Sequence, residues 1–451
     1  GRPSMTWVGS KVCVTTSQCR QLLRRCSLMR GPVDELTVWR QLENGKRVSV
    51  GRLAQNAQGI FFSYTPDYFS RFGNLSPFRL YADARLQKAQ KEPHGGLHGV
   101  FADSLPDGWG LLLQDRWCRR QGMSVSQITP MDRLALVGAN GLGALQYTKA
   151  LDIHSDEASS ELAVLGLAAQ KVFAGEDHVR LDQLLQVGSS GGARPKAQIY
   201  TSDDHFQSIR LIPEPGDIGW IVKFTTERTH LAHEEGLCEA AMLTLAAEAG
   251  LEPVDWRLVD AEGQAGATQW LAVRRFDQTT DGVGRLHMAS AAGLLDVDFR
   301  LPSLDYADLI PWVRQLCQSP ATAQRMFRRA LFNVLIKNQD DHAKNISFLQ
   351  NDAGRWDLSP AYDLTFSPHP FDEHATAFQG YGARPPVEVI DQLGERAAFP
   401  TPKKARAVMH ELIEVVSRFE DVAQELGISR RVRDEIQQAI DAQCDYYASR
   451  L

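Results

Sequence analysis

The stretch Asn338-Gln339-Asp340-Asp341-His342-Ala343-Lys344-Asn345 contains no large aliphatic side chain. An apolar helical pattern precedes it at 326–336, and a short strand-like run follows it at 346–349. Polar loops held between two buried elements are common places for binding and catalytic residues. Asp340 is followed five positions later by Asn345. One interpretation of this spacing is a loop that carries binding or catalytic residues. The alternative is an Asp- and Asn-rich turn that only caps a helix.

The composition is that of an ordinary soluble globular protein, with 43% hydrophobic and 23% charged residues in a chain of 451. A chain of this length has room for roughly three domain-sized units. The net charge of −6 gives no overall attraction to nucleic acid or to an anionic membrane. Because no apolar run approaches the length of a bilayer span, we expect no membrane partner.

The seven cysteines are odd in number and scattered, and none of them forms a C-x-x-C pair. This pattern indicates neither a disulfide framework nor a zinc site. It favours a reducing, cytoplasmic setting, in which thiols stay free.

Residues 1–32 are predicted to be a poorly ordered N-terminal extension. They begin with Gly1-Arg2-Pro3-Ser4, which resembles a tag remnant ahead of Met5. The rest of the extension is basic and lacks the sustained apolar core of a secretory signal. Targeting, contact with a partner and a true start at Met29 are open alternatives.

A β pattern begins after the extension. The apolar runs at 36–39 and 48–53 flank the turn Glu43-Asn44-Gly45, which predicts a hairpin. A third strand is predicted at 60–64, where Pro66 ends the pattern.

Two glycine-containing motifs follow these strands. The first, Phe101-Ala102-Asp103-Ser104-Leu105-Pro106-Asp107-Gly108, leads into an amphipathic helix. The second, Gly141-Leu142-Gly143-Ala144-Leu145, lacks the Lys-Ser/Thr ending of a phosphate loop. We interpret the second motif as tight turns packed on a core.

A glycine-rich segment at 188–197 opens the second half of the chain. Glycines leave backbone N–H groups free to approach an anion, and Arg194 and Lys196 add positive charge. The segment runs into a predicted strand, like the loop that covers the phosphates in protein kinases, whereas a Walker loop enters a helix. A flexible Gly/Ser turn is the alternative.

Lys223 lies on the same face of the predicted strand 218–225 as Ile221. A lysine with an apolar neighbour needs an anionic partner, because it otherwise loses solvation without compensation. Glu239, which borders the apolar stripe of a predicted helix at 232–249, could be that partner, as in protein kinases. The alternatives are a lysine that protects a sheet edge and a solvated surface carboxylate.

Three later features occur in the order that a protein kinase needs. A predicted buried strand at 269–277 ends in charged residues. In the chain order of protein kinases, this is the place of the hinge, the connection between the two lobes that contacts adenine. The 338–345 loop comes next, and a hairpin then leads to Ser359-Pro360-Ala361-Tyr362-Asp363. Mg²⁺ prefers hard oxygen ligands, which Asn345 and Asp363 could supply beside the phosphates of ATP.

Taken together, these motifs resemble the HipA family of bacterial toxin–antitoxin Ser/Thr protein kinases, from about residue 33 onward. Val222-Lys223-Phe224 and Arg275-Phe276-Asp277 also carry the resemblance. It implies an α+β fold: a protein-kinase-like, two-lobed core with an all-helical C-terminal lobe, and an N-terminal β-rich subdomain. The expected boundaries are 33–150 for the subdomain, 151–277 for the kinase N-lobe and 278–451 for the C-lobe.

The resemblance also implies roles for individual residues. Asp340 is the expected catalytic base. Apart from the resemblance, the position of His342 in the same loop could let it orient Asp340, and Lys344 could neutralise the transferred phosphate. Asn345 and Asp363 are the expected Mg²⁺ ligands. The residues expected to bind ATP are Ser189, Ser190, Gly191, Gly192, Ala193, Lys196, the Lys223 and Glu239 pair, and Arg274 and Phe276 of the hinge.

The family switches itself off by autophosphorylating a serine at the start of its glycine-rich loop, and Ser189 or Ser190 holds that position here. The family's target is typically a glutamyl-tRNA synthetase, whose inhibition stalls translation. Its usual partner is a helix-turn-helix antitoxin of the HipB type, through which any DNA contact would be made. Arg194-Pro195-Lys196 departs from the best-known loop pattern, which affects the contacts of the loop and not the fold.

Two other functions are open at this point. A glycine-rich loop and two metal ligands do not define the acceptor, so a lipid or small-molecule kinase is one alternative. The other is a catalytically idle scaffold that binds an antitoxin and co-represses transcription.

Overall fold

The computed structural model describes residues 32–148, 161–176, 180–188, 191–203, 205–262 and 266–451. Helices and strands are mixed along these ranges, so the expected α+β class is confirmed. The predicted N-terminal extension, up to residue 31, lies outside the described residues. The predicted domain boundaries stay predictions.

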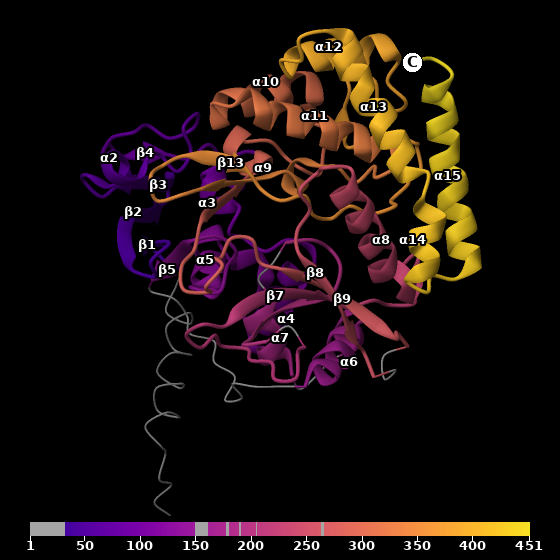
Figure 1. The fold of residues 1–451 in the computed structure, drawn as a ribbon. Helices are drawn as coiled ribbons and strands as arrows, with labels where there is room; N and C mark the ends of the chain where they lie inside the picture. The colour runs from indigo at the N-terminus through magenta and orange to yellow at the C-terminus, as the bar shows by residue number, and fades with distance from the viewer. Residues whose placement is uncertain (1–31, 149–160, 177–179, 189–190, 204, 263–265) are drawn as a thin grey trace, which may run out of the picture.

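A five-stranded antiparallel sheet forms the N-terminal subdomain, with the strand order β4-β3-β2-β1-β5. The predicted hairpin is present, and a hydrogen bond from Gly45 N to Leu42 O closes its turn. The sheet is drawn in indigo and violet in Figure 1. Its strands are β1 (Glu35–Gln41), β2 (Arg47–Asn56), β3 (Gly59–Tyr64), β4 (Gln87–Lys88) and β5 (Leu145–Thr148).

Short helices pack against this sheet and share its hydrophobic core. They are α2 (Tyr68–Phe72), α3 (Gly99–Ala102) and α5 (Pro130–Val137). The next helix in the chain after α3, α4 (Gly108–Arg120), packs elsewhere. Its Trp109 and Leu113 belong to the core of the second sheet, so the N-terminal part reaches into the neighbouring part of the molecule.

The second sheet has four antiparallel strands in the order β6-β7-β9-β8. Alternate residues of β9 face two different cores, because strand side chains alternate between faces: Trp270 lies in the core with α6 and α7, and Leu271 in the core with α8. The strands are β6 (Lys196–Thr201), β7 (Ile218–Lys223), β8 (Trp256–Asp260) and β9 (Gln269–Arg274), and the helices are α6 (Leu162–Phe173), α7 (Leu181–Val187) and α8 (Glu235–Glu248).

The C-terminal part is mainly helical but not all-helical, so that expectation was wrong. β10 (His287–Ser290), β12 (Ser347–Gln350) and β13 (Trp356–Leu358) form a three-stranded sheet. The sequence showed the β12–β13 hairpin, but the apolar pattern around 286–336 concealed β10, which pairs with β12. A two-residue strand pair joins β11 (Leu304–Asp305) to β14 (Thr376–Ala377).

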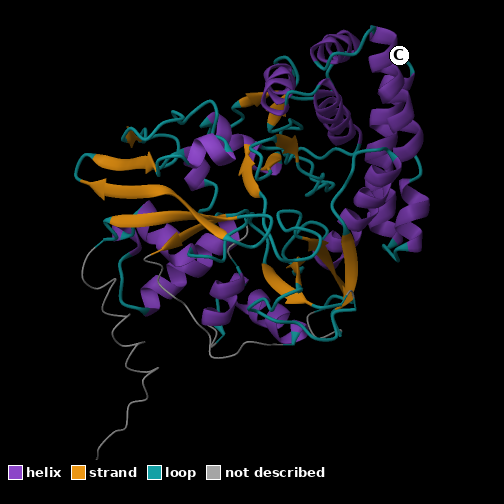
Figure 2. Cartoon of the chain, turned by 60° about the vertical axis from the view of Figure 1, so that its left-hand side comes forward, coloured by secondary structure: helices purple, strands orange, loops and turns teal. Residues whose placement is uncertain are grey.

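The C-terminal helices lie on the opposite side of the molecule from the long strands of the N-terminal sheet (Figure 2). Thr401-Pro402 (a cap, then proline at the first helical position) and the later Gly427 predict a single helix between them. The structure has two helices there, because the chain turns so that Phe419 enters the main core. The helices of this part are α9 (Ala291–Leu295), α10 (Tyr306–Cys317), α11 (Pro320–Leu335), α12 (Val387–Arg396), α13 (Pro402–Val416), α14 (Phe419–Glu425) and α15 (Arg430–Ala448).

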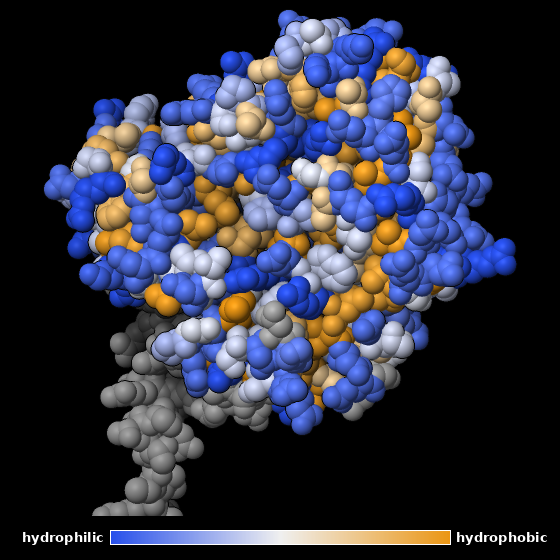
Figure 3. All heavy atoms as spheres, viewed as in Figure 1, coloured by the Kyte–Doolittle hydropathy of each residue, from blue (hydrophilic) through white to orange (hydrophobic). Residues whose placement is uncertain are grey.

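Hydrophilic side chains cover most of the face in Figure 3, with hydrophobic residues gathered between them. None of the helices within the described ranges is long and apolar enough to cross a bilayer. The cysteines in those ranges, Cys118, Cys238, Cys317 and Cys444, are free thiols.

Arg40 of β1 connects the N-terminal sheet to the C-terminal part. Its side chain is fully buried, and its guanidinium donates hydrogen bonds to the Gln350 side chain at 3.1 Å and to the carbonyl oxygens of Gln350 and Asn351 at 3.0 Å. A second contact brings α3 against α9, where a Cβ on Gly99 would collide with the carbonyl oxygen of Gly293. Charge-assisted bonds and close backbone packing therefore hold the two parts together.

We expect Arg40→Met to lower the free energy of unfolding by about 3 kcal/mol, because buried acceptors lose their charged donor. Arg47→Met is the matched control, since the Arg47 guanidinium lies at the surface, 4.4 Å from the centroid of the Trp39 ring. The control should cost less than about 1 kcal/mol. Urea denaturation of both variants measures the difference, and equal losses would contradict the role given to Arg40.

Candidate active site

A cleft lies between the second sheet, the 338–345 loop and the N-terminal subdomain. Its inner cavity contains about 1030 Å³ of empty space, with open solvent at the mouth included. An outer cavity adjoins it. The residues that line both cavities are Asp107, Gly192, Lys196, Lys223, His342, Asn345 and Asp363.

Lys223, at the end of β7, forms an ion pair with Glu239 of α8. The Lys223 Nζ lies 2.7 Å from Glu239 Oε1 and 2.8 Å from Oε2, and it also contacts Asp363 Oδ1. Desolvation would lower the pKa of Lys223, but the two carboxylates outweigh it and raise that pKa. Burial raises the pKa of Glu239, and the positive charge of Lys223 opposes this effect. Lys223 therefore has the anionic partners that its apolar surroundings require.

This geometry rules out the two structural alternatives for the pair. β7 is paired on both sides, with β6 and β9, so Lys223 does not protect a sheet edge. Glu239 is only 3% exposed, so it is not a solvated surface carboxylate.

Asp363 lies in the turn that follows β13. Its φ of 50° is in the left-handed region, which non-glycine residues adopt rarely and mostly where the surroundings impose it. Burial would raise the pKa of Asp363, but Lys223 and Lys196 outweigh burial and lower that pKa to about 2. The Asn338 side-chain amide donates to Asp363 O at 3.2 Å, which ties this turn to the 338–345 loop.

Asp341 holds the 338–345 loop in place. It is 2% exposed and accepts a hydrogen bond from the Tyr306 hydroxyl at 2.9 Å and from Thr376 N at 3.3 Å. His374 Nδ1 lies 3.1 Å from the same carboxylate. The contacts of Asp341 are therefore structural ones, directed away from the cleft.

Asp340 faces the outer cavity, and its side chain is 66% exposed. Protein around the cleft desolvates the carboxylate and raises its pKa; His342 opposes the shift and Asp363 adds to it. His342 Nε2 lies 3.8 Å from Asp340 Oδ1, which is too long for a hydrogen bond. The His342 ring packs on Phe299 instead, so the expected orienting contact is not formed at hydrogen-bond distance.

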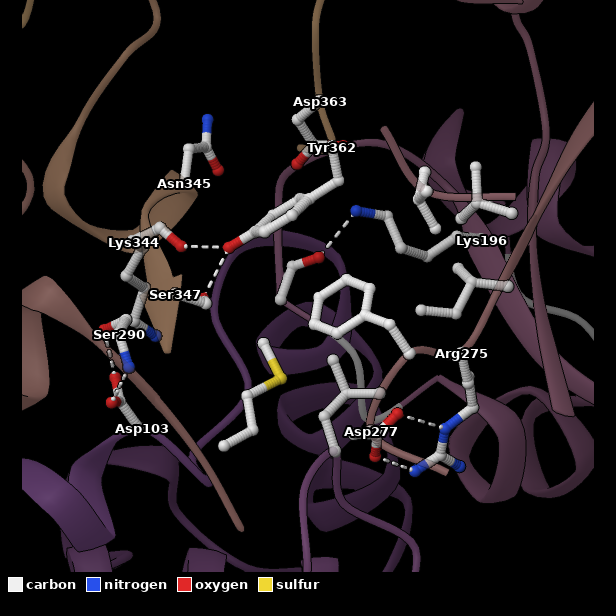
Figure 4. A pocket seen from close by; sticks show the side chains of 18 of the residues that line it. Asp103, Lys196, Arg275, Asp277, Ser290, Lys344, Asn345, Ser347, Tyr362 and Asp363 are labelled. Atoms are coloured by element: carbon white, nitrogen blue, oxygen red, sulfur yellow. Dashed lines mark hydrogen bonds and ion pairs between the residues drawn. The ribbon is translucent and has the colours of Figure 1, made fainter. Parts of the chain in front are cut away.

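Asn345 lies at the end of the same loop and lines both cavities. Its side-chain amide donates to Asp340 O at 2.8 Å, which fixes its orientation at the rim of the pocket shown in Figure 4. Within the described residues there is no cluster of three or more His, Cys, Asp or Glu that could hold a metal. Asn345 and Asp363 offer hard oxygens to the same cavity, which fits Mg²⁺ held jointly by one or two side chains, water and phosphates.

The glycine-rich loop closes the cleft over Lys196. The buried Lys196 Nζ donates to Gly191 O at 2.6 Å. Desolvation lowers the pKa of Lys196, and Asp363 opposes this shift. Ala193 and Arg194 line the outer cavity, where Arg194 Nε lies 2.9 Å from Glu235 Oε1. Ser189 and Ser190, the predicted phosphorylation sites, lie outside the described residues.

The hinge residues Arg274 and Phe276 lie on the wall of the inner cavity. The centroids of the Phe276 and Tyr362 rings are 5.3 Å apart. The remaining apolar lining comes from Leu142, Ile221, Val254, Val273, Met288 and Ala289. This end of the cavity suits a flat, apolar group, and the lysine-rich end suits an anionic one.

Arg275 and Asp277 of the hinge form a buried ion pair, with 2.6 Å between Arg275 Nη2 and Asp277 Oδ2. Asp277 also accepts a hydrogen bond from Gly143 N at 2.6 Å. Arg275 donates to Gly141 O at 3.3 Å. The second glycine motif therefore packs against the hinge, in agreement with its interpretation as tight turns.

Asp107 is the site residue that sequence reasoning missed. It comes from the first glycine motif, and its carboxylate accepts hydrogen bonds from Gly192 N and, at 3.1 Å, from Lys344 Nζ. Burial would raise the pKa of Asp107, but Lys344 and the Gly192 amide outweigh it and lower that pKa. A Pro-Asp-Gly sequence before a helix predicts only a helix cap. The second glycine, Gly110, was the one sequence signal that another segment packs closely against this turn.

Family comparison covers most of the chain. The HipA-like C-terminal domain matches residues 188–441, and the HipA N-terminal domain matches residues 45–148. "Putative kinase Y4dM" of Sinorhizobium fredii is 27% identical over 264 residues, which are 55% of this chain and 63% of that protein. A "Putative kinase" of Haemophilus influenzae is 24% identical over 210 residues, 44% of this chain and 59% of that protein. The chain thus spans less than two thirds of these relatives' lengths.

A solved structure has a similar fold over nearly the whole length. It is the complex of HipA, HipB and operator DNA from the toxin–antitoxin system of Shewanella oneidensis MR-1. The TM-score is 0.66 at 17% sequence identity, and the match covers 91% of this chain and 97% of that chain.

We expect Asp341→Asn to lower the free energy of unfolding by about 3 kcal/mol, because it disturbs a buried and fully bonded carboxylate. Asp340→Asn, one position earlier, should change it by less than about 0.5 kcal/mol, since that side chain faces open space. Thermal and chemical denaturation of the two variants compare the residues directly. A larger loss for Asp340→Asn would contradict the division of roles between them.

Proposed function

Because the chain belongs to the HipA family, we propose that it is an ATP- and Mg²⁺-dependent protein kinase that phosphorylates Ser or Thr hydroxyls as the toxin of a toxin–antitoxin system. One observation carries the proposal. The Lys223, Glu239 and Asp363 cluster shares a cleft with the Asp340 carboxylate and is covered by a glycine-rich loop. The same parts, in the same chain order, perform phosphoryl transfer in protein kinases.

The proposed nucleotide site is the inner cavity. Its apolar end, with Phe276 and Val273, would take the adenine ring, and its charged end would take the phosphates. Lys223, whose pKa is raised by Asp363 and Glu239, would supply positive charge there, and Lys196 lines the same end of the cavity. Mg²⁺ held by Asn345 and Asp363 would neutralise charge on the β- and γ-phosphates.

The acceptor hydroxyl is proposed to enter through the outer cavity, where Asp340 is exposed. The hydroxyl oxygen attacks the γ-phosphorus, its proton passes to the Asp340 carboxylate, and the bond to the β-phosphate oxygen breaks to release ADP. The exposed Asp340 carboxylate is accessible there as the proton acceptor. Lys344 would contribute positive charge from the inner cavity, which it lines.

We extend the proposal to partners by family likeness. The Shewanella protein of similar fold was solved with HipB and operator DNA. An antitoxin of the HipB type is therefore the proposed partner, and DNA contact would run through it. The proposed protein substrate is an aminoacyl-tRNA synthetase, with glutamyl-tRNA synthetase as the first candidate, so that phosphorylation inhibits translation.

We expect Asp340→Asn to lower phosphoryl transfer about 100-fold or more, because the acceptor loses its proton acceptor. ATP affinity should stay within about threefold, since Asp340 does not contact the proposed nucleotide site. Asp434→Asn is the matched control, because Asp434 of α15 is similarly exposed, at 63%, and lies outside both cavities. Labelled ATP with fractionated lysate measures transfer, and calorimetry measures ATP binding.

The same experiment separates the alternatives. Label in protein fractions that needs Asp340 supports a protein kinase, and label in lipid or small-molecule fractions supports a different acceptor. Tight Mg²⁺-ATP binding without transfer would indicate an idle scaffold. Full transfer by the Asp340→Asn variant would contradict the assignment of the base.

Autophosphorylation is part of the proposal. We expect mass spectrometry of the active protein to find phosphate on Ser189 or Ser190, next to the loop that closes over Lys196. A phosphoserine there would repel the phosphates of ATP and weaken nucleotide binding. The Asp340→Asn protein should carry no phosphate at either serine, and an active preparation unmodified at both would contradict self-inactivation.

A further inference from the structure

Residues 106–110 of the N-terminal subdomain lie directly against the glycine-rich loop. Trp109 N donates to Gly192 O at 3.0 Å, and Trp109 Nε1 donates to Lys196 O at 2.9 Å. Gly108 has a φ of 39°, and a Cβ at this position would lie 2.6 Å from Ala193 Cα. Only glycine allows the two backbones to approach this closely, so the loop is packed against this segment.

Asp107 is at the centre of this contact and is 7% exposed. Its Oδ1 accepts the hydrogen bond from Gly192 N, and its Oδ2 lies 3.1 Å from Lys344 Nζ. The two partners are 85 and 237 positions away in the chain. One carboxylate from the N-terminal subdomain therefore joins the glycine-rich loop to the 338–345 loop.

The chemistry of the two partners indicates more than packing. A backbone N–H of a glycine-rich loop and a lysine ammonium are both groups that bind phosphate. A helix cap would turn the Asp107 carboxylate toward the first turn of α4, but here it points to the loop and to Lys344. The Gly192 N–H is used by this bond, so Asp107 fixes the path of the loop, while the Lys344 ammonium keeps further N–H donors for an anionic ligand.

We propose that Asp107 is a positioning residue of the phosphoryl-transfer site, which fixes the glycine-rich loop through Gly192 and holds Lys344 beside the transferred group. The inference rests on the proposed kinase function. Under this proposal the N-terminal subdomain contributes a residue to the active site, because Asp107 positions the glycine-rich loop and Lys344 where the phosphates would bind.

Two substitutions separate the two contacts. Asp107→Asn keeps an acceptor oxygen for Gly192 N but replaces the anionic partner of Lys344 with a neutral amide. Asp107→Ala removes both contacts. Asp115→Asn is the matched control, because Asp115 lies on α4 and pairs with Arg133 at 2.7 Å, away from the cleft.

Hydrogen exchange of the Gly192 amide reports on the loop without any turnover. We expect Asp107→Ala to speed this exchange about tenfold or more, and Asp107→Asn and the control to change it less than about twofold. Unchanged exchange in Asp107→Ala would overturn the proposal. If the unsubstituted chain transfers no phosphoryl group, the proposed function fails, while the exchange rates still decide whether Asp107 holds the loop.

Steady-state kinetics test the second contact. We expect Asp107→Asn to lower kcat about tenfold with KM for ATP within about twofold, because Lys344 acts on the transferred group. Asp107→Ala should also raise KM for ATP about tenfold, since the loop is released as well. The Asp115→Asn control should match the unsubstituted chain. If Asp107→Ala does not fold, Asp107→Asn decides, and an unchanged kcat overturns the role given to Lys344.

Discussion

A lysine ammonium held between two carboxylates determines how the cleft is built. Lys223 extends from a central strand into surroundings where a charge is stable only beside anionic partners. Glu239 comes from a helix buried along most of its length, and Asp363 comes from a turn in the C-terminal part. Three distant segments must therefore arrive at one point for the charge to be compensated. The sheet, the helix and the turn are fixed relative to one another by this requirement.

The two neighbouring aspartates of the 338–345 loop show how such a site combines rigidity with access. Asp341 is fully bonded inside the protein and sets the path of the loop, which leaves Asp340 exposed to the outer cavity. Asn338 bonds to the backbone oxygen of Asp363 and Asn345 to that of Asp340, and a short 3₁₀ helix at Ala343–Asn345 completes the loop. The Asp340 carboxylate is thus exposed on a loop whose backbone is held by side-chain hydrogen bonds.

Much of this arrangement could be predicted from the sequence, because charge, glycine content and strand period are local signals. Residue spacing predicts the hairpin, the strand with Lys223 and the helix with Glu239. It also singles out Asp340 and Asn345, which are five positions apart. β10 and the break before Phe419 could not be predicted, because tertiary contacts decide them. Asp107 was missed for the same reason, since its partners lie 85 and 237 positions away. The roles of Ser189 and Ser190 stay predictions.

The contact between the hinge and the second glycine motif affects how the molecule can move. In a hinge joined only to its own two lobes, a few backbone torsions can open the cleft. Here Asp277 and Arg275 are also bonded to backbone atoms of Gly143 and Gly141, so a large rotation at the hinge would break a buried ion-pair network. Two backbone atoms of the second glycine motif are therefore bonded directly to the segment that we predict to be the hinge. A rearrangement of this segment would have to break these buried bonds, whereas exposed loops can shift locally and on a faster timescale.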